Sequence, residues 1–178
     1  AGRPIKVVGN LPYNIASPLT IELLKKRNCI EKMVLMYQKE VADRLTAIPG
    51  NKKYGFLTLI TTLHADIRSS LSVGKEAFYP RPKVESTLII LKPLTCPREK
   101  LENEKYFTMV VKSAFSQRRK KLRNALKSIE GADLSSDFIE MICRETGIDP
   151  NRRGETLTLK EFARLSNHLF FALSKRER

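Results

Sequence analysis

The heptapeptide VGNLPYN, residues 8–14, decides how the first half of the chain folds. Residues 6–9, Lys-Val-Val-Gly, follow Pro4 and predict a short strand that ends at a Gly-Asn pair, where turn-forming residues begin. Pro12 then fixes the backbone of a loop that carries an amide and an aromatic ring. The Asn10 side chain offers a carbonyl acceptor, and Tyr13 offers a stacking face. A loop with these groups can hold a flat heterocycle with an exocyclic amine, such as adenine.

Beyond the heptapeptide, helix and strand patterns alternate along the sequence. Ser17 predicts a helix N-cap, with Pro18 at the first helical position. The further expected elements are a strand over 30–37, a helix over 39–48, a segment over 57–65 that fits either type, and strands over 67–73 and 86–91. This order favours a parallel-type α/β sheet with an antiparallel pair at its end.

From Glu99 onward, the spacing of apolar residues predicts helices only. The expected buried faces are Phe107, Val110, Val111, Ala114 and Phe115; Leu122, Ala125, Leu126 and Ile129; Phe138, Ile139 and Ile142; and Phe162, Leu165, Leu169 and Leu173. Gly147 ends the third helix, and Thr158 with Glu161 forms a capping box that opens the fourth. Since Pro93 and Pro97 mark a boundary, we expect an α/β domain over 1–95 and a small all-helical domain over 96–178.

The charge of the chain points to a polyanionic partner. Lys and Arg number 33 against 19 Asp and Glu, which gives a net charge of +14. Residues 1–95 carry 15 basic and 7 acidic side chains, and residues 96–178 carry 18 and 12, so the excess is spread over both halves. Nucleic acid is the expected polyanion. We expect no membrane partner, because long apolar runs, lipidation signals and a signal peptide are lacking, and we expect a cytoplasmic or organelle-matrix protein.

The cysteines and histidines indicate neither a metal site nor a disulfide framework. Cys29, Cys96 and Cys143 are odd in number and far apart, and His64 and His168 have no paired spacing. We therefore expect free buried thiols and ordinary histidines.

A second stretch, over residues 78–84, reads Phe-Tyr-Pro-Arg-Pro-Lys-Val, and its prolines predict an extended, rigid loop. Adenine N6 is a poor nucleophile until acceptors bind its hydrogens, and the Asn10 side chain and Leu11 carbonyl could do so, with Pro12 fixing the direction. Tyr13 and Phe78 could stack on the two faces of the base. Taken alone, these residues more often form a strand-ending turn with core aromatic rings.

Residues 10–14, Asn-Leu-Pro-Tyr-Asn, resemble the catalytic motif of adenine-N6 methyltransferases. Residues 78–86 resemble the second base-holding motif of the ribosomal RNA adenine dimethyltransferases, whose type is the kasugamycin-resistance methyltransferase. Segments 38–45, 54–55, 114–124 and 153–157 are similar to further parts of that family, so the resemblance spans nearly the whole chain. Leu11 in place of Ile, together with residues 117–124, favours the small-subunit enzymes over the antibiotic-resistance methylases of 23S rRNA.

The resemblance implies methyl transfer from S-adenosylmethionine to N6 of two adjacent adenosines near the 3′ end of small-subunit (16S) rRNA, in ribosome biogenesis. It implies a 30S pre-ribosomal particle as partner, and chemistry without a metal or a covalent enzyme intermediate. The catalytic residues would be Asn10, Leu11, Pro12 and Tyr13, with Tyr13 and Phe78 stacking on the base and Asn10 next to the methyl donor.

The family builds its S-adenosylmethionine site on a Gly-rich first strand turn and on acidic residues after the next two strands. No Gly-x-Gly turn occurs in this sequence, and Ala1 precedes the strand of Asn10 directly. We therefore expect the C-terminal part of a Rossmann-like methyltransferase sheet, with most of the cofactor site outside these residues. A fragment, a processed form and a chain completed by another chain all fit this expectation.

Five cations within six positions predict an RNA-binding patch at the start of a helix: Arg118, Arg119, Lys120, Lys121 and Arg123. A solvated helix face is the ordinary role of such a run, yet five cations around one helix must leave some pointing outward to phosphates. Arg81 and Lys83 would guide RNA beside the pocket, and Arg152 and Arg153 are weaker candidates.

Two rival functions remain open from the sequence. A non-catalytic RNA-binding or ribosome-assembly module would use the same basic segments without turnover. A DNA adenine-N6 methyltransferase would share the motif at residues 10–13, although the C-terminal motifs argue against it.

Overall fold

The computed structural model describes residues 3–129 and 134–174. The chain divides into two compact units. The α/β unit comprises Ala1–Ala47 and Ile60–Arg98, and the helical unit comprises Ile48–Leu59 and Glu99–Arg178. Residues 48–59 thus group with the helical unit, and the second division lies close to the boundary expected after Thr95. That 1–95 and 96–178 fold as separate domains stays a prediction.

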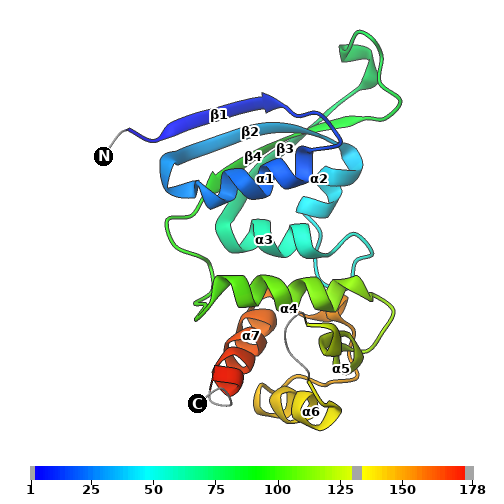
Figure 1. Cartoon of the computed structure of the whole chain (residues 1–178). Coiled ribbons are helices and arrows are strands. Elements are labelled where there is room, and N and C mark those ends of the chain that lie inside the picture. Colours follow the sequence, from blue (N-terminus) through cyan, green and yellow to red (C-terminus); the bar gives the residue numbers. More distant parts are fainter. Residues whose placement is uncertain (1–2, 130–133, 175–178) are drawn as a thin grey trace. The chain divides into compact units, whose positions relative to one another are not determined.

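A four-stranded sheet forms the centre of the α/β unit (Figure 1). In spatial order its strands are β1 (Ile5–Asn10), β2 (Ile30–Gln38), β4 (Ser86–Pro93) and β3 (Ala65–Val73). β1 runs parallel to β2, whereas β4 runs antiparallel to both of its neighbours. β1, β2 and β3 therefore share one direction, as the sequence predicts.

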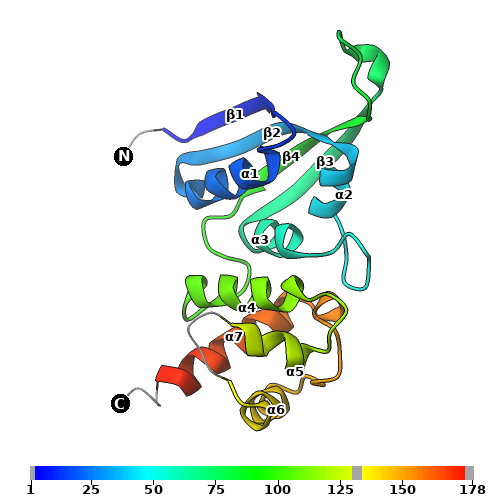
Figure 2. The same ribbon diagram turned by 45° about the vertical axis from the view of Figure 1, so that its right-hand side comes forward.

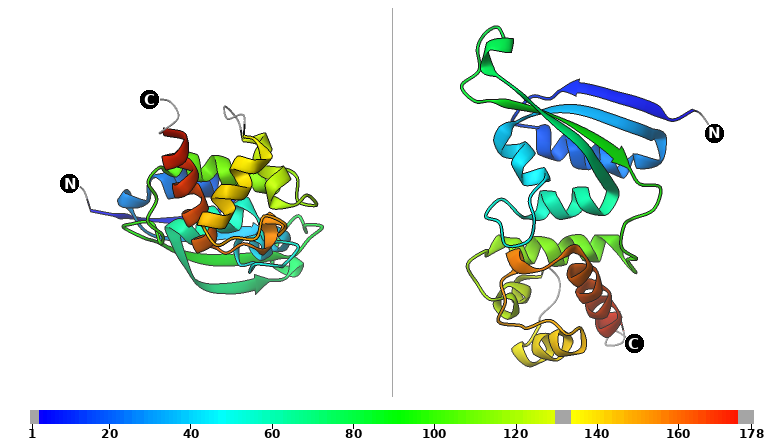
Figure 3. Two further views of the ribbon diagram at one scale, coloured as in Figure 1. Left: turned by 90° about the horizontal axis from the view of Figure 1, so that it is seen from below. Right: turned by 180° about the vertical axis from the view of Figure 1, so that it is seen from behind.

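The sheet ends in the antiparallel pair β4 and β3, as expected, and the antiparallel strand β4 lies inside the sheet between β2 and β3. β3 is joined to β4 by a loop and a single turn of 3-10 helix, without a helical crossover, and such a direct connection produces antiparallel neighbours. β2 and β4 occupy the middle of the sheet because both are strongly apolar: Met33, Leu35, Ile89 and Leu91 are fully buried. β1 forms one edge, as the view from behind in Figure 3 shows.

Three helices follow the first strands: α1 (Ala16–Lys25), α2 (Lys39–Leu45) and α3 (Phe56–His64). α1 connects β1 to β2 and lies along one face of the sheet (Figure 1). The ambiguous segment over 57–65 is helical up to His64, and Leu59, Ile60 and Leu63 are buried at helical spacing.

Two helix boundaries differ from those predicted. α1 begins at Ala16 with Ile15 as the N-cap, so Ser17 lies inside the helix and forms no cap. Pro18 is tolerated there because the first N–H groups of a helix have no acceptor within it. α2 ends at Leu45, before the stop expected at residues 49–50.

The helical unit contains, among its described residues, α4 (Glu104–Ser116), α5 (Leu122–Ala125), α6 (Ser136–Glu145) and α7 (Leu159–Ser174) (Figure 2). Single turns of 3-10 helix in the chain are η1 (Arg27–Cys29), η2 (Lys75–Ala77), η3 (Leu126–Ser128) and η4 (Gly154–Thr156). The predicted buried faces are confirmed except at Phe115 and Leu173, which are half-buried; Phe107, Val110 and Leu122 are fully buried.

Both predicted helix ends in this unit are confirmed. The Thr158 N–H donates to the Glu161 carboxylate at 2.7 Å, and the Glu161 N–H donates to the Thr158 hydroxyl at 3.2 Å, which is a capping box. Gly147 has a φ of 64° just after α6, a left-handed conformation that glycine adopts without a steric penalty.

The basic run does not begin a helix, contrary to the prediction. Residues 118–121 form the turn between α4 and α5, and of the five cations only Arg123 lies within a helix. α4 ends at Ser116, and the Lys120 N–H donates to the Gln117 carbonyl at 2.8 Å. The chain turns here because Leu122 must return to the core, where it is fully buried.

No helix within residues 3–129 and 134–174 is long and apolar enough to cross a membrane. The same residues hold no group of three or more His, Cys, Asp or Glu side chains placed to share a metal ion. Cys143 is buried, which raises the pKa of its thiol to about 11. Cys29 and Cys96 are exposed, because they lie in connections between elements, and this corrects the expectation of buried thiols.

Candidate active site and nucleic-acid interface

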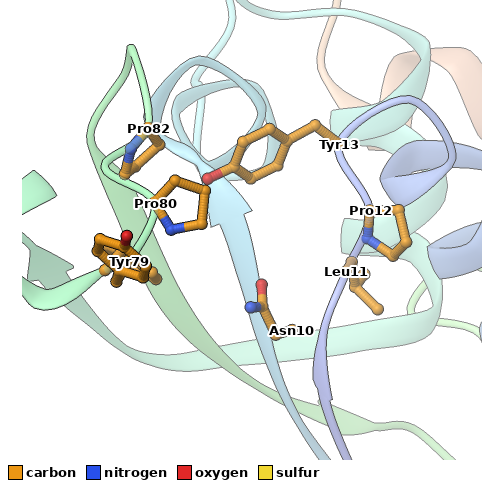
Figure 4. Close-up of a pocket in the computed structure, with 8 residues that line it drawn as sticks. Asn10, Leu11, Pro12, Tyr13, Tyr79, Pro80 and Pro82 are labelled. Carbon is orange, nitrogen blue, oxygen red and sulfur yellow. The ribbon is translucent and has the colours of Figure 1, made fainter.

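A pocket of about 390 Å³ in the α/β unit joins the two sequence motifs (Figure 4). One wall is the loop after β1, and the other is the proline-rich loop before β4. The lining residues are Asn10, Leu11, Pro12 and Tyr13 on one side, and Phe78, Tyr79, Pro80 and Pro82 on the other. Segments some 70 positions apart in the sequence therefore share one cavity, and each residue expected to contact the base borders it.

Asn10 is the last residue of β1, where it pairs with Met36 of β2. Its side chain is exposed and makes no hydrogen bond with another described residue. Figure 4 shows its carboxamide in the space between the two walls. Open α/β sheets bind ligands at the carboxyl ends of their strands, and Asn10 lies at such an end. The amide oxygen is thus available to a ligand.

The backbone of Leu11 is fixed on both sides. Its N–H donates to the Met36 carbonyl at 3.4 Å, and the Pro12 carbonyl accepts from the Ile15 N–H at 3.1 Å. The Leu11 side chain is 7% exposed and anchors the loop in the core. No hydrogen bond between described residues uses the Leu11 carbonyl, so it is a second available acceptor.

A hydrogen bond between Tyr13 and Ser86 connects the two motifs directly. The Tyr13 hydroxyl lies 3.1 Å from the Ser86 hydroxyl, and Ser86 is the first residue of β4 and fully buried. This contact fixes the direction of the half-buried Tyr13 ring. Ser86 belongs to the second motif, but its sequence context predicts no role for it, because the contact depends on the fold.

The proline-rich loop presents two neighbouring aromatic rings in different environments. Phe78 is half-buried, whereas Tyr79 is fully exposed. Arg81 pairs with Glu76, and Lys83 is exposed without a hydrogen bond or ion pair to a described residue. Of the two basic residues expected to guide RNA, Lys83 is therefore the one with a free charge.

None of the eight lining residues is an acid, a histidine, a lysine or an arginine. The pocket offers an amide oxygen, a main-chain carbonyl and aromatic and proline faces. Such groups recognise a flat ring with an exocyclic amine through two accepted hydrogen bonds and stacking.

In the helical unit, the five cations of the basic run fall into two classes. Arg118 donates to Glu155 at 3.0 Å and lies over the Phe115 ring, with 5.7 Å to its centroid. Arg123 donates to Glu140 at 2.9 Å, and Lys121 donates to Asn151 at 3.0 Å. The side chains of Arg119 and Lys120 are exposed and have no such bond to a described residue.

A second basic loop lies beside this run. The N–H groups of Leu122 and Arg123 donate to the carbonyls of Arg152 and Pro150, at 2.7 and 3.1 Å. At Gly154 the loop approaches α4 so closely that a Cβ would lie 3.0 Å from the Ala114 carbonyl oxygen. Main-chain contacts therefore hold the two loops together.

Of the two arginines in the second loop, Arg153 is the one with a free charge. Arg152 binds the Glu161 carboxylate at 2.5 Å and the Thr156 carbonyl at 2.7 Å. Arg153 is exposed and has no hydrogen bond or ion pair to the rest of the described chain.

A third segment, residues 48–54, is tied to the same region. The Gly50 N–H donates to the Glu155 carbonyl at 2.8 Å, and the Tyr54 hydroxyl donates to the Leu157 carbonyl at 2.8 Å. Burial, reinforced by the charge of Glu161, raises the pKa of Tyr54 well above its usual range, so this hydroxyl stays a donor. Exposed Lys52 lies in this segment. We call Lys52, Arg119, Lys120 and Arg153 the basic surface. Lys52 is not among the residues predicted from the sequence, because no local pattern marks it.

Comparison with known proteins identifies relatives along nearly the whole chain. The model of the family described as ribosomal RNA adenine dimethylase matches residues 1–169. The ribosomal RNA small subunit methyltransferase A of Syntrophotalea carbinolica is 46% identical over 163 residues, which are 92% of this chain and 61% of that protein. The protein of the same name from Geobacter metallireducens is 46% identical over 165 residues, 93% of this chain and 60% of that protein. The chain thus spans about three-fifths of these curated relatives.

Two solved structures share the fold. A dimethyladenosine transferase from Plasmodium falciparum superposes with a TM-score of 0.78 at 23% identity, covering 99% of this chain and 70% of the other. The 23S rRNA methyltransferase ErmE superposes with a TM-score of 0.66 at 21% identity, covering 96% of this chain and 67% of the other. The Rossmann-like methyltransferase architecture expected from the sequence is confirmed.

Proposed function

The chain belongs to the ribosomal RNA adenine dimethylase family, and on that premise we propose that it methylates adenine N6 in ribosomal RNA. The target we propose is the pair of adjacent adenosines near the 3′ end of small-subunit rRNA, within the 30S pre-ribosomal particle. The names of the curated relatives support a small-subunit substrate. The methyl donor we propose is S-adenosylmethionine.

One observation carries this proposal: the pocket that the loops after β1 and before β4 form together. Its free acceptors lie at the carboxyl end of a strand, and its aromatic residues lie on two opposite loops. A pocket of about 390 Å³ is within the range of small-molecule sites, so it can admit one nucleobase.

Asn10 and Leu11 would activate the target amine. The lone pair of adenine N6 is delocalised into the ring, which makes the amine a weak nucleophile. Acceptance of both N6 hydrogens, by the Asn10 amide oxygen and the Leu11 carbonyl, would localise that lone pair and hold the nitrogen in place. Tyr13 and Phe78 would stack on the two faces of the base and supply its binding energy after it leaves the RNA stack.

S-adenosylmethionine supplies an electrophilic methyl group on a sulfonium sulfur. Of the residues in this chain, Asn10 is the one that we place next to the donor, because its exposed carboxamide ends β1 and is already free of protein partners. The neutral pocket suits this reaction, since no lining charge would compete with the amine for its acceptors.

The basic surface would anchor the RNA through its phosphates. Arg119, Lys120, Arg153 and Lys52 project from loops whose backbones are tied together. Phosphate contacts fix register and orientation on RNA without reading sequence. Arg118, Lys121 and Arg123 would support this surface through their bonds to Glu155, Asn151 and Glu140. Lys83, with Arg81, would guide the strand beside the pocket.

Transfer of a radiolabelled methyl group to undermethylated small ribosomal subunits tests the proposal. Because most of the cofactor site is expected outside these residues, the assay uses a protein in which a Gly-rich cofactor-binding half precedes this chain. We expect incorporation with that protein, its loss on Asn10→Ala, and no change on Asn28→Ala, an exposed asparagine in η1. Binding to the subunits without transfer, and without heat on titration with S-adenosylmethionine, would identify a non-catalytic RNA-binding module. Equal transfer to a DNA oligonucleotide would instead identify a DNA methyltransferase.

A further inference from the structure

Tyr79 is the most exposed large apolar side chain among the described residues, at 102% of its reference accessibility. The next in order, Val8, reaches 78%. Tyrosine usually buries most of its ring in a folded chain, because the ring carries a large apolar area. Packing within the described part of the α/β unit therefore does not explain why an aromatic ring occupies position 79.

The position of Tyr79 relates it to the pocket. It borders the same cavity as Phe78, and Figure 4 shows it across the opening from Leu11 and Pro12. Phe78 has an extended backbone, with φ −125° and ψ 145°, so the side chains at 78 and 79 diverge. Phe78 turns into the wall and is half-buried, whereas Tyr79 turns outward at the rim.

The loop holds Tyr79 by its backbone and not by side-chain packing. The N–H groups of Ala77 and Phe78 donate to the carbonyls of Gly74 and Lys75, at 3.2 and 3.3 Å. Pro80 follows directly and fixes its own φ while restricting the conformation of Tyr79. A tyrosine ring has only two side-chain torsions, so ordering it against a ligand costs little entropy.

An exposed aromatic ring beside a base pocket and a free cation is typical of surfaces that bind single-stranded nucleic acid. Lys83 provides that cation on the same loop. A protein partner would need an apolar surface around Tyr79, but its loop neighbours Pro80, Arg81 and Lys83 are exposed and partly charged. RNA fits this composition better.

We propose that Tyr79 is a stacking surface for the nucleotide next to the target adenosine, so that the site takes two consecutive bases of a single strand. One base occupies the pocket between Tyr13 and Phe78, and its neighbour lies on the Tyr79 ring. This proposal rests on the proposed function of the pocket and extends it from a one-base to a two-base site.

Binding of a twelve-nucleotide single-stranded RNA with two adjacent adenosines tests this subsite, with fluorescence anisotropy as the readout. Loss of one stacked base on alanine substitution weakens binding by about 5- to 150-fold. We expect such a loss for Tyr79→Ala and full retention for Tyr79→Phe. Leu71→Ala removes another exposed apolar side chain, 63% exposed on β3 and outside the pocket lining, and should change nothing.

Abasic sites in the RNA separate neighbour stacking from a general effect. Two further RNAs lack the base 5′ or 3′ of the target adenosine. If Tyr79 stacks on that neighbour, the Tyr79→Ala penalty disappears in one of these RNAs and persists in the other. A penalty of the same size in all three RNAs would overturn the proposal.

Phe78→Ala distinguishes failure of the subsite from failure of the pocket. If Phe78→Ala weakens binding and Tyr79→Ala does not, the pocket assignment stands and the second stacking surface is wrong. If neither variant weakens binding, the base pocket itself is wrong, and the subsite fails with it. Because Tyr79 is fully exposed, we expect the unfolding temperature of Tyr79→Ala to match that of the unmodified chain.

Discussion

The pocket and the basic surface are built on opposite principles. The pocket has a neutral lining, and its acceptors and rings are fixed by a strand end, by prolines and by the bond between Tyr13 and Ser86. The basic surface has free charges on exposed side chains, while its backbone is fixed by main-chain hydrogen bonds. A base edge requires acceptors at set distances, whereas a phosphate requires only charge within reach.

This difference implies a division of labour between the two units. Removal of the Asn10 acceptor should alter chemistry with little effect on RNA affinity, whereas removal of a stacking ring should also weaken binding of the base. Substitutions on the basic surface should alter affinity and its salt dependence with little effect on chemistry. The following variants test that division, beginning with the largest expected effect.

Asn10→Ala should lower the rate of methyl transfer by about 10²- to 10³-fold, the usual cost of removing one preorganised hydrogen-bonding group. RNA affinity should stay nearly constant, because phosphate contacts dominate it. Single-turnover transfer and filter binding measure the two quantities on the same preparation. A parallel fall of affinity and rate would show that the Asn10 acceptor itself contributes to anchoring, and would contradict the separation of chemistry from affinity at this residue.

The double variant Arg119→Ala/Lys120→Ala should reduce the salt dependence of RNA binding. Each lost phosphate contact lowers the slope of log affinity against log salt by about 0.9 on duplex-like RNA, so the pair should lower it by about 1.8. The measurement is affinity across a salt series. The unfolding temperature should not change, since neither side chain has a bond to lose. An unchanged slope would remove both residues from the interface.

Tyr13→Phe should destabilise the fold by about 1–2 kcal/mol, because it leaves the fully buried Ser86 hydroxyl without its partner. Urea unfolding measures this cost. Tyr79→Phe is the matched control, since it removes a hydroxyl from a fully exposed ring. Equal stability of the two variants would mean that the two motifs are not coupled through this bond.

Arg118→Ala should cost about 1 kcal/mol of stability, through its part-exposed ion pair with Glu155 and its contact with the Phe115 ring. Its effect on the salt slope should be smaller than that of Arg119→Ala. Thermal unfolding measures the loss of stability, and the same salt series measures the change in slope. A full phosphate-sized change in slope without a loss of stability would place Arg118 among the RNA ligands.

The smallest expected effect concerns pH and Glu161. Burial acts to raise the pKa of this carboxyl, but hydrogen bonds from Arg152 and Thr158 outweigh it and hold the pKa below its usual value of 4.5. The carboxylate therefore stabilises the fold above pH 4.5, and this contribution is lost as the pH falls through the lowered value. Urea unfolding at about pH 6 and about pH 3 gives the free energy of unfolding of the unmodified chain and of Glu161→Gln. The difference between the two proteins should be smaller at the lower pH, by less than about 1 kcal/mol. A gap that widens in acid would contradict this sign.

Local sequence patterns predict much of the fold. The apolar strands β2 and β4, the helical core around Phe107 and the capping box at Thr158 follow from residue spacing alone. The interior position of β4 does not, because strand order depends on the connections between strands. The charge run predicts a helix start at residues 118–121, where the structure has a turn, because charge does not distinguish the two. Only the burial of Leu122 requires the reversal.

The site divides in the same way. The resemblance marked Asn10, Tyr13 and Phe78, which the structure brings to one cavity. The roles of Ser86 and Lys52 depend on contacts with residues far along the chain: Tyr13 bonds to Ser86, and Glu155 bonds to the segment of Lys52. No local pattern could therefore assign these two residues. Among the cations, the sequence could not separate Arg119 from Arg118, because the difference lies in Glu155, 37 positions away from Arg118.

The two hydrogen bonds from the Leu122 and Arg123 amides to the 150–152 segment also allow hydrogen–deuterium exchange to report on the basic surface. Their amides should exchange with deuterium only when the two loops separate, as amides in paired strands do, whereas the Arg119 amide between them and α4 should exchange quickly. RNA that binds both loops would slow the first pair further. The exchange rates of the Leu122 and Arg123 amide protons would then measure RNA binding to the basic surface, although neither proton contacts the RNA.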